Sequence, residues 1–367
     1  MSLTIFASLM ITYAVVQTIV FLLLVRLLDP YEREPLSLLA LMALWGAVGA
    51  TSLSAVGNVA LRNWLPPDVA VVFGRALYAP VVEELAKGSA LVAFVVLSVW
   101  AGGRFGMPRF EGVTDGIVYG AAIGLGFAFT EDVLYMLIGA QQQGLEQGYV
   151  AYLARRDFFG LSMLHHAIYS ATFGVGLGLA TWFRGSRTRS LLPVAGLVTA
   201  IGLHAFNNGW VSLTLTRVYG FEETLRYLEG GGGPIRRQMQ ETAADASAAV
   251  GVADYALILL FGLMIYLWLR YQRKVIRDEL AEEAASGLIS RTELELLPRY
   301  WQRTWWYWQL VRSGQWERWR VLKRIHNELV DLAFTKHRYR RTGIGRDDVE
   351  RRRRLIDKLK AQKIVFI

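Results

Sequence analysis

Seven long apolar segments constrain the fold of this chain more than any other feature. Each is close to the roughly 20 residues that a helix needs to cross the hydrocarbon core of a bilayer. Hydrophobic residues make up 53% of the 367 residues, which is too many for an ordinary soluble domain. The expected spans are residues 4–28, 36–56, 79–100, 113–137, 162–183, 190–213 and 252–270. We therefore predict an all-α, polytopic transmembrane helix bundle of about seven spans.

Charge divides the chain into a membrane domain, residues 1–270, and a basic C-terminal domain, residues 271–367. The second contains 23 Lys and Arg against 13 Asp and Glu, whereas the first contains 17 against 18. Basic segments beside a span are retained in the cytoplasm. We therefore expect a cytoplasmic C-terminus and, with an odd number of spans, an N-terminus outside. The absence of cysteine excludes disulfides, thiolate metal ligands and a cysteine nucleophile.

One longer extracytoplasmic loop is expected within the membrane domain, at residues 214–251. It contains a short helical segment, the run Gly230–Gly233 and an Ala-rich stretch. Four consecutive glycines hold no fixed geometry cheaply, so this run predicts a flexible joint. The joint is either a plain linker or a gate over a functional site.

The C-terminal domain is expected to form three to five short helices. Ser290 and Glu293 match a capping box. Gly314 and the segment 342–345 are natural breaks between helices. Its six Trp between residues 301 and 319, interleaved with Arg, suit contact with anionic lipid of the inner leaflet or with a cytoplasmic protein. The alternative is a small bundle with a solvated basic face; nucleic-acid binding is not expected of a membrane-tethered domain.

Ionisable and amide side chains inside the apolar segments predict a functional site, because burying them in lipid is costly. Adjacent spans run in opposite directions, which brings these groups to the same half of the bilayer. They comprise the following residues on four successive spans: Glu83, Glu84, Lys87, Glu131, His165, His166, His204, Asn207 and Asn208. Two Glu-bearing and two His-bearing spans at one depth are typical of a hydrolytic site.

Glu83 and Glu84 cannot both face one centre, since neighbouring helical residues point about 100° apart. We expect one carboxylate at the reacting centre and the other paired with Lys87, three or four residues further along the helix. The alternative is a structural Glu–Lys pair that bridges helices.

Glu131 is expected to face the site from the next span, and the adjacent Asp132 to face the surface. Of the two histidines on the following span, we favour His166, because Tyr169 and Ser170 follow it on its helical face. His165 is a supporting candidate.

His204 and Asn208 lie four residues apart and therefore share one helical face. A neutral imidazole binds metal or orients a water, and an amide donates to a developing oxyanion. The alternative is a simple His–Asn contact between helices.

In order along the chain, these motifs resemble the PrsW family of intramembrane proteases, which is similar to the wider CAAX-protease and bacteriocin-processing (ABI) group. The resemblance covers roughly residues 30–215 and is closest in the segments GLGFAFTEDVLY and HHAIYSATFGVGLG. It implies a metalloprotease that cleaves a single-pass membrane protein, such as an anti-sigma factor, near the extracytoplasmic side. Related enzymes also suggest a glutamate-activated water without metal. The sequence departs from the family pattern at Ser170, where an acidic residue can occur, and in its long C-terminal extension.

The leading hypothesis is thus an intramembrane endopeptidase in which Glu83 or Glu84 acts as general base on a water. The expected zinc ligands are Glu131, His166 and His204, which leave an open coordination position. Asn208 is expected to stabilise the oxyanion. The rival hypotheses are a proton- or ion-coupled transporter that uses the same Glu/His cluster, and a catalytically inactive receptor or scaffold.

Overall fold

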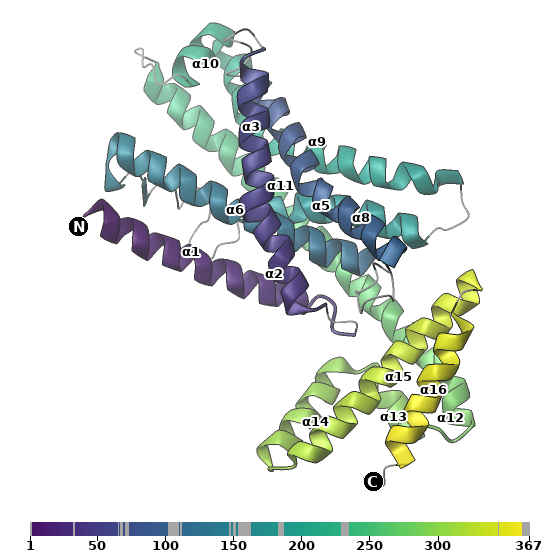
Figure 1. Ribbon diagram of the computed structural model, residues 1–367. Coiled ribbons are helices and arrows are strands. Elements are labelled where there is room, and N and C mark those ends of the chain that lie inside the picture. Colours follow the sequence, from purple (N-terminus) through teal and green to yellow (C-terminus); the bar gives the residue numbers. More distant parts are fainter. Residues whose placement is uncertain are drawn as a thin grey trace. The chain divides into compact units, whose positions relative to one another are not determined.

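The computed structural model describes residues 2–31, 34–64, 66, 69, 73–101, 110, 112–146, 148–149, 152, 163–182, 187–228, 235–343 and 345–361. Every regular element within these ranges is a helix (Figure 1), so the all-α prediction is confirmed for them. The chain divides into two compact units, which are described separately. Unit 1 comprises Met1–Asp29 and Glu34–Phe261; unit 2 comprises Pro30–Arg33 and Gly262–Ile367.

Five helical segments of the described residues are long and apolar enough to cross a membrane. They are Leu3–Arg26 (α1), Leu36–Ala60 (α2, the π-helix η1 and most of α3, which spans Thr51–Arg62), Val113–Gln142 (in α6), Leu191–Tyr219 (α9) and Arg237–Ala285 (α11 and its continuation). The other two expected spans are also helices, α5 (Ala79–Ala101) and α8 (Leu164–Trp182). Helix α5 carries Glu83, Glu84 and Lys87, and helix α8 carries His165 and His166. These polar side chains reduce the hydropathy of both helices. The count of seven spans remains a prediction.

Helix α6 (Val113–Gln143) lies in the middle of unit 1, where it packs against α1, α2 (Leu36–Leu44), η1 (Trp45–Ala50) and α8 (Figure 1). Its glycines permit these contacts. A Cβ atom at Gly116, Gly120 or Gly124 would overlap the backbone of α8, and one at Gly126 would overlap the backbone of α2. Small residues at such interfaces let membrane helices approach closely. The group met at Gly124 is the backbone of His166, so this glycine sets how near a candidate site residue comes to α6.

The segment 214–251, which we expected to be an extracytoplasmic loop, is largely helical in its described residues, and its place outside the membrane remains a prediction. Helix α9 continues to Tyr219, α10 spans Phe221–Leu228 and α11 begins at Arg236. The Ala-rich stretch has high helix propensity and continues into the apolar segment without a break. The run Gly230–Gly233 lies outside the described residues, so the flexible joint remains a prediction.

Unit 2 contains the C-terminal part of α11 (Arg236–Glu279) and the helices that follow it. They are α12 (Ala281–Ala285), α13 (Arg291–Leu296), α14 (Tyr300–Arg312), α15 (Trp316–Thr342) and α16 (Arg346–Ala361). Both halves of the capping box between Ser290 and Glu293 are formed, as predicted. Gly314 and Gly343 have positive φ and separate the last three helices. The bundle has its own buried apolar core, which includes Ile276, Leu297, Ile325, Leu329 and Ile356.

Candidate functional site

Helix α5 brings two carboxylates and one ammonium into the interior of unit 1. Lys87 Nζ donates to Glu84 Oε1 at 2.5 Å, and both side chains are buried. The same ammonium lies 4.4 Å from the centre of the Phe127 ring. Glu84 is therefore the glutamate that pairs with Lys87.

His166 lies between α5 and α6 and contacts a charged group at each ring nitrogen. Its Nδ1 is 3.1 Å from Lys87 Nζ, and its Nε2 is 2.8 Å from Glu131 Oε2. An ammonium can only donate, so Nδ1 accepts and Nε2–H donates to Glu131. Close packing of α8 on α6 at Gly124 holds the imidazole in this place.

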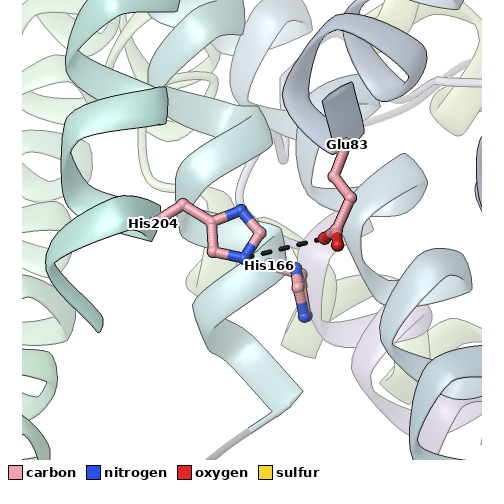
Figure 2. Close-up of side chains that lie close together, drawn as sticks. All are labelled: Glu83, His166 and His204. Carbon is pink, nitrogen blue, oxygen red and sulfur yellow. Dashed lines mark ion pairs between the residues drawn. The ribbon is translucent and has the colours of Figure 1, made fainter. Parts of the chain in front are cut away.

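His204, on α9, contacts both neighbouring carboxylates of α5. Its Nδ1 is 2.9 Å from Glu84 Oε1, and its Nε2 is 3.6 Å from Glu83 Oε2 (Figure 2). Asn208 Nδ2, one helical turn later, lies 3.3 Å from the same Nε2. A carboxylate at Nδ1 fixes that proton and leaves the Nε2 lone pair directed at Glu83 and Asn208. This carboxylate–imidazole arrangement is the one that orients metal-binding histidines.

Glu83, His166 and His204 form a group that can hold a metal ion. Each is buried and offers one ligand atom, and these atoms lie within 4.8 Å of one another. Figure 2 shows the three side chains pointing toward a common point from three helices. One carboxylate and two imidazoles are the donor set of catalytic zinc sites with an open position, so the residues present fit such an ion. An ion held by His166 needs one ring nitrogen and would replace either Lys87 or Glu131 there.

Glu131, which we expected among the ligands, is not a member of this group. Its carboxylate instead contacts Nε2 of His166. Its side chain is 18% exposed, compared with 7% for Glu83 and 1% for Glu84. Of these three carboxylates it is the most accessible.

Asp132 is 2% exposed, so the expectation that it faces the surface is wrong. Because α6 has neighbours on several sides, facing away from the site does not mean facing lipid or water.

Asp254 is a site residue that the sequence analysis missed. It lies on α11 and is buried, and its Oδ2 is 3.0 Å from His165 Nε2 and 3.1 Å from Asn207 Nδ2. A lone acid in the apolar segment 252–270 was the available signal. His165, the supporting candidate, thus joins α8 to α11.

Tyr169 connects the two histidine-bearing helices. Its ring stacks on His204, with centroids 5.0 Å apart and planes 21° apart, and also stacks against His165. Tyr169 therefore lies between the ring of His204 and that of His165, which contacts Asp254.

Comparison with known proteins agrees with this constellation. Residues 34–224, just over half of the chain, match the family described as PrsW family intramembrane metalloprotease. The chain belongs to the PrsW family. It is thus a multi-pass integral membrane protein. The matched segment contains all the clustered residues except Asp254.

A curated relative is Protease PrsW of Geobacillus kaustophilus (strain HTA426), which is 29% identical over 153 residues. The aligned part is 41% of this chain and 58% of the relative, so this PrsW-family chain spans little more than half of that protein's length. No solved structure matches.

Proposed function

We propose that this protein is an intramembrane endopeptidase that hydrolyses a peptide bond in a membrane-anchored protein. The observation that carries the proposal is the buried group of Glu83, His166 and His204, within a chain of the PrsW family. Burying a carboxylate and two imidazoles at one point inside apolar helices is costly. A catalytic metal site requires donors of this kind, which accounts for the cost of burying them.

Glu83, His166 and His204 would hold the ion, and zinc is the ion that this donor set favours. When bound, it would supply Lewis-acid polarisation and a water that is acidic near neutral pH. Glu84 holds His204 through Nδ1 and is itself held by Lys87. Neither Glu84 nor Lys87 needs to touch the substrate for this positioning role.

Glu131 is the residue that we assign as general base. It is the most accessible of the three carboxylates and lies 2.8 Å from His166, so it can reach a water beside the ligand group. This assignment exchanges the roles that the sequence analysis gave to Glu83 and Glu131. Asn208, beside His204 Nε2, can donate its amide to the developing oxyanion.

The proposal extends to topology and substrate. Seven spans, with the N-terminus outside and the basic C-terminus in the cytoplasm, would place the site in the extracytoplasmic half of the bilayer. A single-pass protein such as an anti-sigma factor is the substrate class that suits this depth. In this topology, the basic C-terminal domain would contact either the inner leaflet or a cytoplasmic protein.

Two isosteric variants test the assignment of the carboxylates. In proteoliposomes, Glu83→Gln should lower both zinc content and cleavage of a single-pass reporter peptide with a dye and a quencher flanking its outer boundary. Glu131→Gln should keep the zinc and lower kcat by about 10²–10⁴-fold, the usual contribution of a general base. Glu222→Gln, an exposed glutamate on α10, is the matched control and should change neither quantity.

The outcomes separate the hypotheses. Zinc lost in Glu131→Gln but kept in Glu83→Gln would restore the original ligand set. A fully active wild type without bound metal would support the metal-free, glutamate-activated mechanism. Cleavage that survives in both variants would sink the roles assigned to these two carboxylates. A wild type that does not cleave the reporter would sink the peptidase proposal, and an ion flux that depends on the same residues would favour the transporter.

A further inference from the structure

Helix α14 has two opposite faces, both rich in large side chains. Its inner face is buried in unit 2 through Tyr300 and Leu310. Its outer face presents Trp301, Trp305 and Trp308, which are 66%, 59% and 47% exposed. These three residues recur at intervals of four and three and therefore form one stripe. We call this stripe the tryptophan face.

The tryptophan face is not needed to close the core of unit 2. That core is formed by other residues of α11 to α16 and by the inner side of α14. Exposed contiguous aromatic surface of this kind marks an interaction site rather than a packing feature. Its indoles are nonetheless ordered against each other, because Trp305 and Trp308 stack with centroids 5.1 Å apart.

The surroundings of the tryptophan face are basic. The segment 296–316 contains three arginines and no acidic residue. Arg303 is buried on the inner face, so Arg299 and Arg312 are the exposed ones. Arg312 continues the stripe, and its guanidinium lies 5.3 Å from the Trp308 ring centre. Arg299 is exposed just before the helix begins. The face therefore combines indole rings with positive charge.

Several other cations of unit 2 are already neutralised within the unit. Lys336, Arg352 and Arg353 each bind carboxylates of their own unit. Within the described part of the chain, no ion pair involves Arg299 or Arg312. Their charge remains available to an external anion.

We propose that the tryptophan face docks on the anionic surface of the bilayer in which the protein is inserted. Indole rings favour the headgroup level of a membrane, and arginine binds lipid phosphate through planar paired hydrogen bonds. Because unit 2 is tethered to a membrane-embedded unit, that surface is present at high effective concentration. Each basic residue near an anionic leaflet strengthens attachment by about fivefold. This inference does not depend on the proposed peptidase activity.

Hydroxyl-radical footprinting of the full chain in nanodiscs tests the proposal directly, since it reports side-chain exposure. The probe membranes are pure phosphatidylcholine and phosphatidylcholine with about 40% phosphatidylglycerol, an anionic lipid that gives a strongly negative leaflet. Oxidation of Trp301, Trp305 and Trp308 should be about fivefold slower in the anionic discs at low salt, and high salt should reverse the protection.

Paired variants identify the cause. Arg299→Gln with Arg312→Gln should remove most of the protection of the indoles. Arg291→Gln with Arg354→Gln removes the same charge from exposed positions elsewhere in unit 2 and should leave the protection intact. The single change Trp305→Gln keeps the inner face of α14 and serves if the double variant misfolds; it should expose Trp301 and Trp308 to oxidation in the anionic discs.

Three results would overturn the proposal. Equal oxidation in both disc types would show that the anionic surface does not cover the face. Protection that is equally strong in detergent would show that protein covers it. Protection that appears only when two copies share a disc would assign the face to self-association.

Discussion

Two networks of charged side chains, each centred on a buried lysine, stabilise different parts of this molecule, and they differ in their charge balance. In unit 2, Glu282 and Glu283 meet Lys336 and Arg353, so two carboxylates face two cations. Lys336 Nζ lies 2.7 Å from Glu283 Oε2, and Arg353 lies 2.7 Å from Glu283 Oε1. In unit 1, by contrast, the network contains three carboxylates and a single ammonium, that of Lys87, which contacts Glu84; the remaining partners are imidazoles. The members of this network in unit 1 are Glu83, Glu84, Glu131, Lys87, His166 and His204.

The difference separates a structural network from a chemical one. A buried ion pair is tolerated when each charge is compensated, which the balanced network of unit 2 achieves with its own residues. The network of unit 1 has an excess of carboxylates that a divalent ion or protons would neutralise. Charge imbalance in a buried cluster is therefore the feature that points to function, more than the number of ionisable groups.

The strongest test of this contrast removes the central lysine of each network. Lys336→Met should destabilise unit 2 by about 3–5 kcal/mol, because buried Glu283 loses a compensating charge. Lys87→Met should instead reduce cleavage by about 10–100-fold, as expected when a residue that orients ligands is lost. Chemical unfolding followed by tryptophan fluorescence, together with reporter cleavage, measures both effects. If a stable Lys336→Met protein lost as much cleavage as Lys87→Met does, the distinction between a structural and a chemical network would be wrong.

Acid should weaken unit 2 through His326, whose ring is buried beside Tyr307. Burial, assisted by the charge of Arg303, lowers the pKa of His326 to about 4. The unfolded chain takes up this proton near pH 6.5 whereas the folded one does not, so stability falls as pH decreases from 6.5 toward 4. The total loss is at most about 3 kcal/mol.

The measurement is thermal unfolding of the full chain between pH 7 and pH 4.5, with His326→Asn as the comparison. The melting temperature of the wild type should fall across this window, and that of the variant should stay flatter. A parallel decline in both proteins would assign the acid sensitivity to other groups.

Gly124→Ala should sharpen the role of helix packing in the site. The added methyl group would overlap the backbone of His166, and overpacking of this kind costs about 1–3 kcal/mol. Reporter cleavage should fall because the added methyl group would displace His166 from its contacts with Lys87 and Glu131. Gly251→Ala, where a Cβ has open space, is the matched control and should be neutral or slightly stabilising. If Gly124→Ala behaves like this control, the close approach is not essential.

The smallest expected effect concerns Asp254, which lies outside the family match. Asp254→Ala should lower kcat by about 10-fold with little change in KM, since it positions His165 and Asn207 rather than the substrate. Asp254→Asn keeps an oxygen that can accept both hydrogen bonds and should recover most of the activity. A change confined to KM, or no rescue by Asn, would contradict a positioning role.

Local sequence determined much of this protein. Apolar length gave the helical membrane class, and the ionisable residues within the spans gave the members of the central cluster. Ser290 and Glu293 fixed a helix start, and Gly314 a break, because capping and positive φ depend on a few neighbouring residues. The pairing of Glu84 with Lys87 was restricted to two choices by helical spacing.

Tertiary structure decided the remainder. It chose Glu83 over Glu84 for the ligand group, placed Glu131 outside that group, buried Asp132 and brought Asp254 from a distant helix to His165. Helical periodicity fixes the direction of a side chain relative to its own helix, but not which neighbour that direction meets. The meeting partners depend on how closely the helices approach, and the glycines of α6 set that approach only once α8 and α2 are packed against them.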